Sequence, residues 1–283
     1  MNRNFQYLLT FLFLGAVLIW AAVAQTPDKN LHLFVLDVGQ GDSILLKTPT
    51  DKKVLIDGGP DDKVLGQLGQ TLPFYDKKID LVILTHPDAD HLTGLVDVIK
   101  NYEVGEIWAT GVIHTTDTYL NWLNLVKEKQ IPYKIAFLGT NADFGDQAKL
   151  EVLWPPKSLS GQKADNNNNT SLVTKLSYLN FCAILPGDGE NEVLDNLNLI
   201  DSHCQVLKAS HHGSNDAASV KLLQQVSPKL VVISVGKDNK FGHPQAKALD
   251  IYKKYSNEIF RTDLNGRVEI ITNGQNFWTK TAR

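Results

Sequence analysis

Short apolar runs recur along the chain from about Leu31, and they constrain the fold more than any other feature. They are rich in Val, Ile and Leu and are bounded by Gly, Pro, Asn or Asp, which is typical of β-strands. Between them, apolar residues recur at helical spacing, as in Leu92, Leu95, Val96 and Ile99. No linker-like break follows residue 30. This alternation predicts one layered α/β domain over residues 30–283.

Two further helices and a hairpin are expected in the second half of the chain. The stretches "SVKLLQQV" and "QAKALDIYKKY" have helical patterns. The Asn265-Gly266 pair in the closing stretch "RTDLNGRVEIITNG" is a strong signal for a two-residue β-hairpin turn.

Composition places the chain among globular proteins. Its 283 residues are 43% hydrophobic and 21% charged, which is enough to bury a sizeable core. The net charge of −3 supplies no overall attraction for nucleic acid, although local basic patches can still exist. Charge therefore counts mildly against a DNA substrate.

The first 29 residues differ from the rest. Arg3 precedes an uncharged, mostly apolar stretch over residues 7–24, a length shared by signal peptides and short membrane-spanning helices. Ala22-Val23-Ala24 offers a cleavage site, whereas Trp20 favours retention as an anchor. Residues 1–29 thus predict export of the domain, as a membrane-anchored or a secreted or periplasmic protein, with both alternatives open.

The two cysteines, Cys182 and Cys204, both lie in apolar strand-like runs. The simpler interpretation is two small buried side chains. A disulfide across neighbouring strands is the alternative in an oxidising compartment.

The stretch "LTHPDADHLTG" gathers four side chains that can bind metals directly after an apolar run. His86 and Asp88 are two apart in an extended segment, so they project to the same side and can share one metal. Asp90 and His91, at the start of the next helix, can face a second. The alternative is an exposed polar loop with a helix cap. Further polar residues after later strands weigh against that alternative, because layered α/β folds assemble active sites in this way.

The same stretch resembles the signature loop of the metallo-β-lactamase superfamily. The resemblance covers about residues 31–270 and is closest to the metallo-β-lactamase-like domain of ComEC-type competence proteins, which act in DNA uptake; secreted phosphorylcholine esterases are more distant. It implies an αβ/βα four-layer sandwich. The further motifs, in the family's order, are "LDVGQGDSILL", "VLIDGG", "NNTSLV", "LPGD", "LKASHHGS", "ISVGKDNKFGHP" and "RTDLNG".

The resemblance also implies two divalent metal ions and their ligands. His86 and Asp88 would bind the first ion, Asp90 and His91 the second, and Asp188 would bridge them. In "SHHGS", one histidine is expected to bind the second metal; His212 is preferred and His211 is expected to contact the substrate, with the choice between the two open. The full expected metal set is His86, Asp88, Asp90, His91, Asp188 and His212. Outside this context, Asp188 would be interpreted as a turn residue.

Further residues receive roles from the same resemblance. Asp90, His211 and His243 are the expected catalytic residues, although His243 could equally be a histidine at a helix start. Asn169, Ser171 and Lys208 are expected near the substrate, with a solvated surface lysine as the alternative for Lys208. Asp57 is expected to orient a histidine ligand rather than bind metal. Asp37 and Asp42 are interpreted mainly as turn formers, with a role in the site as the weaker alternative.

The chain departs from the broad superfamily pattern at the first metal. Asp88 replaces the usual second histidine, and "NNNNTS" stands where a third ligand is expected. Carboxylate in place of imidazole makes manganese or magnesium credible beside zinc.

The first functional hypothesis is a metal-dependent phosphodiesterase or nuclease acting on DNA outside the cytoplasm. The alternatives are a phosphodiesterase for a small or envelope substrate such as phosphorylcholine, a weaker case for lactam or thioester hydrolysis, and a catalytically weak binding module. Membrane association through residues 7–24 is a further expectation, and the sequence does not identify any protein partners.

Overall fold

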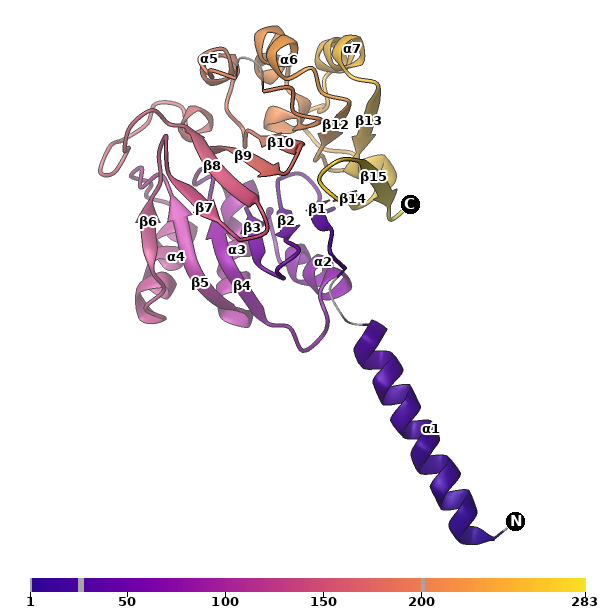
Figure 1. Cartoon of the computed structure of the whole chain (residues 1–283). Coiled ribbons are helices and arrows are strands. Elements are labelled where there is room, and N and C mark those ends of the chain that lie inside the picture. Colours follow the sequence, from indigo (N-terminus) through magenta and orange to yellow (C-terminus); the bar gives the residue numbers. More distant parts are fainter. Residues whose placement is uncertain (1, 25–27, 200–201) are drawn as a thin grey trace.

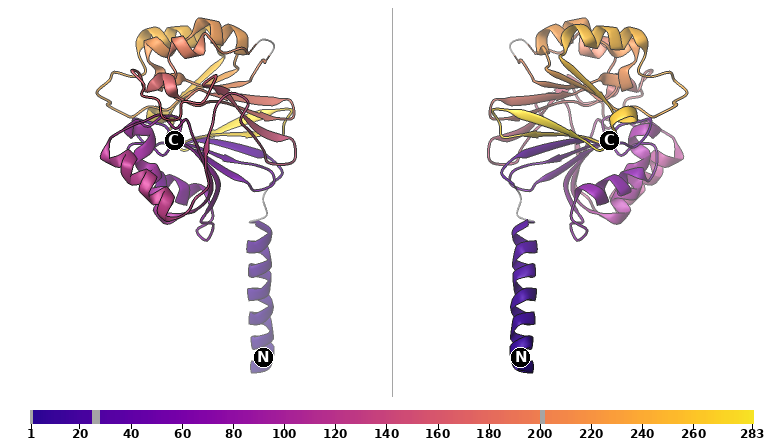
Figure 2. Two further views of the ribbon diagram at one scale, coloured as in Figure 1. Left: turned by 90° about the vertical axis from the view of Figure 1, so that its left-hand side faces the viewer. Right: turned by 90° about the vertical axis from the view of Figure 1, so that its right-hand side faces the viewer.

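The computed structural model describes residues 2–24, 28–199 and 202–283. The predicted cleavage point after Ala24 adjoins residues 25–27, which lie outside these ranges. In the described ranges, two β-sheets face each other and helices cover their outer faces (Figures 1 and 2). This is the predicted αβ/βα four-layer sandwich.

The first sheet has eight strands in the described ranges and is parallel only along β3-β4-β5-β6. Its order is β15-β14-β1-β2-β3-β4-β5-β6. The strands are β1 (Leu31–Val35), β2 (Ile44–Lys47), β3 (Lys53–Ile56), β4 (Lys78–Ile83), β5 (Glu103–Ala109), β6 (Tyr133–Ile135), β14 (Val268–Thr272) and β15 (Phe277–Thr281).

The second sheet has seven described strands in the order β13-β12-β11-β10-β9-β8-β7, and β10 to β13 run parallel. The strands are β7 (Asn141–Asp143), β8 (Ala148–Trp154), β9 (Val173–Tyr178), β10 (Phe181–Leu185), β11 (Val206–Lys208), β12 (Leu230–Ile233) and β13 (Glu258–Arg261).

The helices lie mainly on the outer faces of the sandwich. They are α1 (Arg3–Ala24), α2 (Lys63–Thr71), α3 (Ala89–Asn101), α4 (Asp117–Glu128), α5 (Asn191–Leu194), α6 (Val220–Val226), α7 (Ala246–Tyr255) and α8 (Thr262–Asn265). Three short 3₁₀ turns cover Asn168–Thr170, Ser210–Gly213 and Asn215–Ala217. α2, α3 and α4 cover the first sheet, while α5, α6 and α7 cover the second (Figures 1 and 2).

The apolar runs are nearly continuous because both faces of each sheet are buried. In β1, Leu33 and Val35 point into the core between the sheets, whereas Phe34 packs in the core beneath the helices. In β10, Leu185 faces the inter-sheet core and Ile184 the helices of the second layer. Successive residues of each strand thus alternate between the core between the sheets and the core beneath the helices.

The predicted hairpin turn at Asn265-Gly266 is wrong. The pair instead ends α8, where the Gly266 N–H donates to the Thr262 carbonyl and Gly266 takes a positive φ of 67°. A glycine that accepts this backbone serves a helix end as readily as a hairpin, which explains the misleading signal. The actual hairpin joins β14 and β15 eight residues later along the chain, at the turn over residues 273–276.

Cys182 and Cys204 form a disulfide, with their Cα atoms 4.7 Å apart. Cys182 lies in β10 and Cys204 precedes the neighbouring strand β11. The disulfide alternative is therefore the one that the structure adopts.

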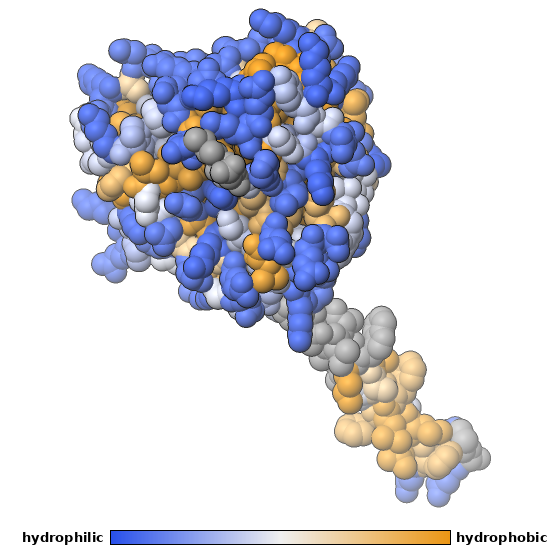
Figure 3. Space-filling model, turned by 45° about the horizontal axis from the view of Figure 1, so that its top comes forward, coloured by the Kyte–Doolittle hydropathy of each residue, from blue (hydrophilic) through white to orange (hydrophobic). Residues whose placement is uncertain are grey.

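The predicted apolar segment near the N-terminus forms α1, which extends away from the sandwich (Figure 1). Apolar residues cover much of its surface (Figure 3). Phe11, for example, is 75% exposed. Within the described ranges, none of the helices combines the length and apolarity needed to cross a membrane.

Candidate metal centre

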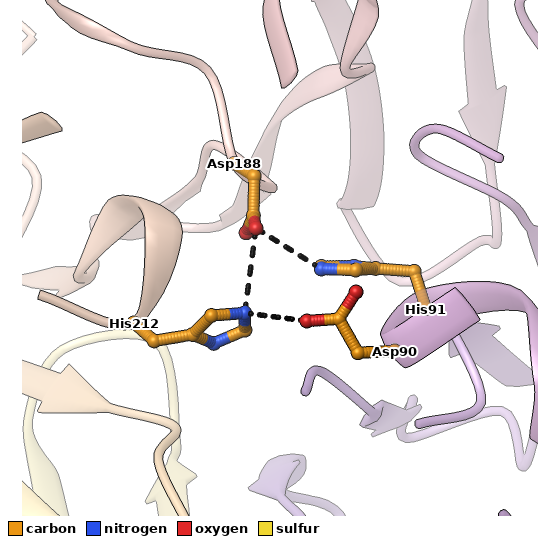
Figure 4. Close-up of side chains that lie close together, drawn as sticks. All are labelled: Asp90, His91, Asp188 and His212. Carbon is orange, nitrogen blue, oxygen red and sulfur yellow. Dashed lines mark ion pairs between the residues drawn. The ribbon is translucent and has the colours of Figure 1, made fainter. Parts of the chain in front are cut away.

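Four side chains from three distant parts of the chain meet in one cluster (Figure 4). Asp90 and His91 stand in the first turn of α3, Asp188 follows β10, and His212 lies in the loop after β11. The Asp188 Oδ2 atom is 3.2 Å from His91 Nε2 and 3.3 Å from His212 Nε2. The His212 Nε2 atom is 3.3 Å from Asp90 Oδ2. Ligands about 2.1 Å from one tetrahedral ion lie about 3.4 Å apart, so these spacings suit a metal.

His86 and Asp88 lie beside this cluster. The His86 Nε2 atom is 3.7 Å from Asp88 Oδ2, and the rings of His86 and His91 are 4.2 Å apart between centroids. We call His86 and Asp88 the first position, and Asp90, His91 and His212 the second position. Asp188 contacts two members of the second position. The structure thus brings together all six residues of the expected metal set.

The imidazoles of the second position are oriented from behind. His91 donates from Nδ1 to the Asp57 Oδ2 atom at 2.8 Å, and His212 donates from Nδ1 to the Ser234 carbonyl at 3.0 Å. A ring whose Nδ1 donates a proton presents the lone pair of Nε2 on its other side. Asp57, as placed here, holds His91 and does not face the cluster's centre.

The first-position histidine is oriented by a hydroxyl. Thr85 Oγ1 donates to the Asp57 Oδ2 atom at 2.7 Å, so it can accept a proton from His86 Nδ1 at 3.0 Å. Ser171 Oγ, at 3.3 Å from the same Nδ1, also accepts the Asp188 backbone N–H at 3.1 Å. Ser171 is fully buried, so it holds the site together from beneath and does not line the cleft.

The Nε2 atoms of all three histidines are buried without a hydrogen-bond partner, as is Asp188 Oδ1. Buried polar atoms are ordinarily paired, so four unpaired atoms in one cluster call for a missing partner. Imidazole nitrogens and carboxylates together are donors that divalent zinc and manganese accept. The residues therefore fit the metal ions that the fold family implies.

Charge in this cluster is balanced by protons when no metal binds. Burial alone would lower the pKa of His91, but Asp188, Asp57 and Asp90 outweigh it and raise that pKa well above the ordinary value. The pKa of His212 is likewise raised well above the ordinary value, by Asp188 and Asp42. Burial would raise the pKa of Asp188, yet the two histidines hold it well below the ordinary range.

His86 behaves in the opposite way. Burial and the nearby charge of His91 lower its pKa to about 3, so its ring is neutral at pH 7. A neutral imidazole is ready to bind a metal, whereas His91 and His212 must first release protons.

The backbone of the "SHHGS" loop is strained at both histidines. His211 and His212 have φ values of 45° and 54°, in the left-handed region that side chains with a Cβ rarely adopt. Such strain persists only where surrounding contacts hold it, and it concentrates at functional sites. Here it turns His212 into the cluster and leaves His211 at the rim.

A buried ion pair behind His212 was not foreseen from the sequence. Lys208 in β11 and Asp42 are each about 1% exposed and form an ion pair, and Asp42 Oδ1 lies 3.4 Å from His212 Nδ1. The structure thus gives Asp42 the weaker of its two predicted roles, a part in the site, and it excludes a solvated surface position for Lys208. One signal could have revealed the pair: a lysine inside a buried strand run requires a carboxylate partner.

Three members of the cluster, Asp90, Asp188 and His212, line a cleft of about 190 Å³. His211 and His243, both expected at the substrate, line it. Burial, followed by the charges of His212 and His211, lowers the pKa of His243.

The asparagine loop reaches the site through residues other than the expected Asn169. Asn167 Nδ2 donates to Asp88 Oδ1 at 2.7 Å, and Asn168 lines the cleft. The Asn169 side chain instead bonds to Glu192 and to the Glu190 backbone N–H.

Known proteins resemble this chain in both sequence and fold. The family model described as the metallo-beta-lactamase superfamily matches residues 36–155. ComE operon protein 3 of Bacillus subtilis (strain 168) is 29% identical over 256 residues, which cover 83% of this chain and 32% of that protein. Competence protein ComA of Neisseria gonorrhoeae is 26% identical over 253 residues, covering 86% of this chain and 32% of that protein. The chain thus spans about a third of the length of these relatives.

Among solved structures, the metallo-beta-lactamase fold protein YhfI from Bacillus subtilis matches with a TM-score of 0.54 at 10% identity. The match covers 88% of this chain and 100% of that chain. At this identity the likeness concerns the fold.

Proposed function

Because this chain carries a hydrolase domain of the metallo-β-lactamase superfamily, we propose that it is a metal-dependent phosphodiesterase that cleaves DNA outside the cytoplasm. One observation carries the proposal. Three buried imidazoles, each with Nδ1 facing a hydroxyl, carboxylate or carbonyl oxygen, turn unpaired Nε2 atoms toward carboxylates at the floor of a cleft. This arrangement suits two-metal hydrolysis of an ester.

Some of these residues would bind the metal ions, and others would contact the substrate. His86 and Asp88 would bind one ion, Asp90, His91 and His212 the other, and Asp188 both. When bound, divalent ions supply a hydroxide nucleophile at neutral pH and offset charge on the phosphoryl oxygens.

His211 and His243 are placed to contact the phosphate from the rim. The lowered pKa of His243 keeps its ring neutral at pH 7, which favours a hydrogen bond to a phosphoryl oxygen over proton donation as a general acid. The buried pair of Asp42 and Lys208 would hold His212 in position.

DNA as substrate is supported by two relatives, one of which is named a competence protein and the other a recombination protein. Export is supported by the disulfide between Cys182 and Cys204, because disulfides persist in oxidising compartments. Membrane association through residues 7–24 belongs to the same proposal. It is supported by the exposed apolar side chains of α1.

The test is cleavage by the full chain, purified without chelator and supplied with zinc or manganese. The substrates are labelled single- and double-stranded DNA beside bis-p-nitrophenyl phosphate, and Asp90→Ala is the control. DNA cleavage that requires both metal and Asp90 is the expected result. Turnover of the small diester alone would replace DNA with a small or envelope phosphodiester. No turnover and no bound metal would favour a binding module.

A further inference from the structure

Phe241 stands at the mouth of the cleft with 53% of its surface exposed. A single exposed apolar residue is ordinary on a protein surface. Among the described residues that line this cleft, however, Phe241 is the apolar one, and the others are carboxylates, histidines and amides. Phe241 therefore places an aromatic face beside polar side chains that suit a phosphate group and its metal ions.

The loop that carries Phe241 is held rigidly by Asn239. The Asn239 Nδ2 atom donates to the carbonyls of Gly236 and His243 at 2.9 and 2.7 Å, and its Oδ1 atom accepts the His243 N–H at 3.0 Å. The Phe241 ring also lies nearly parallel to the His243 ring, at 24° and 5.8 Å between centroids. An aromatic side chain on a loop that is already ordered by hydrogen bonds loses less conformational entropy when a ligand stacks on it.

The size of the cleft places part of the substrate outside it. Pockets that enclose a drug-sized molecule measure about 300–1,000 Å³. The cleft here measures about 190 Å³, which suits a phosphodiester group but not a nucleoside. A base attached to the sugar beside that phosphate must lie at the rim, where Phe241 stands.

The charge beside Phe241 favours a base over a cationic head group. The Lys240 Nζ atom lies 5.3 Å from the centre of the Phe241 ring. A trimethylammonium group at this ring would meet the like charge of Lys240. A nucleotide instead offers a π-face to Phe241 and a neighbouring phosphate to Lys240.

From this geometry we infer that Phe241 is a stacking platform for an unpaired nucleobase next to the phosphodiester in the cleft. The inference rests on the proposed function and narrows it to single-stranded nucleic acid. Bases inside a duplex already stack on one another, so only a single strand or a frayed end offers a free face. Stacking on an aromatic ring tolerates any base, so little sequence preference is expected.

The test compares Phe241→Ala and Phe241→Trp with the unsubstituted full chain. Each is assayed on a single-stranded oligonucleotide and on a matched strand in which abasic sugars replace the bases. The ratio of kcat/KM for the two strands should fall about 5- to 150-fold in Phe241→Ala, because stacking of one base contributes that factor. Phe241→Trp should keep the ratio of the unsubstituted chain, because tryptophan also offers an aromatic face. Phe74→Ala, which removes an 84% exposed phenylalanine from a different loop, is the matched control and should keep it.

A second measurement keeps this inference separate from the hydrolase proposal. Binding of the same two strands is followed by fluorescence anisotropy in the Asp90→Ala chain, with and without Phe241→Ala. Loss of preference for the strand with bases would support stacking even if no diester were cleaved. An equal ratio in the presence and absence of Phe241, in cleavage and in binding, would overturn the stacking role and leave the phosphodiesterase proposal standing.

Discussion

The two halves of the candidate metal centre differ in their number of ligands and in how those ligands are held. In the second position, His91 and His212 are fully buried and each is held from behind, by Asp57 and by the Ser234 carbonyl. In the first position, the buried His86 faces only neutral hydroxyls at Nδ1, and Asp88 is its one partner ligand. The carboxylates of the two positions are similarly exposed, at 35% for Asp88 and 32% for Asp90, so the difference lies in the second position's additional histidine and in the groups that hold its rings. Partners that orient a ligand raise metal affinity. The second position should therefore bind its metal more tightly, and the first should exchange its metal with solvent.

The largest expected effect is the loss of a second-position ligand. His212→Ala should lower kcat/KM about 10³-fold and abolish tight metal binding, because charge stabilisation by a metal contributes several kcal/mol. Asp88→Ala should lower kcat/KM only about 10- to 100-fold, since water can replace one partly exposed carboxylate. Steady-state kinetics and metal content of the purified variants measure both. An equal loss in the two variants would contradict the proposed asymmetry.

The buried pair behind the second position should matter for stability. Lys208→Met leaves Asp42 charged and buried without its partner, which should lower the free energy of unfolding by about 3–5 kcal/mol. Lys253→Met removes a lysine from an exposed ion pair with Asp250 and should change stability by no more than about 0.5 kcal/mol. Urea unfolding of the two variants measures the difference. Similar stabilities would show that the pair is not structurally important.

The two positions should also give opposite pH dependence in the chain kept metal-free by a chelator. His91 and His212 have raised pKa values, so their stabilising contribution is complete below about pH 6.5 and declines as pH rises. His86 has a folded pKa of about 3, so its contribution declines as pH falls below about 6.5. Stability should therefore be greatest near pH 6.5.

The His86 contribution can be isolated by substitution. His86→Asn should remove about 1.5 kcal/mol of the stability lost between pH 6.5 and 5, because asparagine does not titrate in this range. It should leave the decline above pH 6.5 in place. Denaturant unfolding at a series of pH values measures both limbs, and an unaltered acid limb would disprove the assignment to His86.

The smallest expected effect concerns the asparagine loop at the first position. Asn167→Ala removes the hydrogen bond to Asp88 and should weaken metal binding there about 5-fold, because such a bond contributes about 1 kcal/mol. Asn166→Ala is the matched control, because its side chain bonds to Glu190 and not to Asp88. Competition with a chromophoric chelator measures both. Equal affinities in the two variants would argue against a role for Asn167.

Much of the fold was predictable because its signals are local. In a strand, alternate residues face the two cores, and in a helix, residues three or four apart, such as Leu92 and Leu95, share one face. Both patterns involve residues that are close together in the sequence. The prediction of a hairpin at Asn265-Gly266 was wrong because a glycine with positive φ occurs in several types of turn and helix end. Which type forms depends on the packing of the residues around it.

The site was predictable where its residues are close in sequence. His86, Asp88, Asp90 and His91 lie on one strand end and one helix start, so their meeting required no knowledge of distant contacts. The asparagine loop was harder, because side chains in a loop point where backbone dihedrals send them. Asn167 and Asn168, rather than Asn169, therefore face the site.

By itself, the sequence determined the layered α/β architecture and the closeness of His86, Asp88, Asp90 and His91, because periodicity and local spacing encode them. The expected roles of Asp188 and His212 came from the resemblance of their motifs to a known family. Only the tertiary structure decided that His212 rather than His211 enters the cluster, that Asp42 pairs with Lys208 behind it, and that Cys182 meets Cys204. These pairings join residues from different strands and loops. They depend on long-range packing and on backbone conformations that no local pattern encodes.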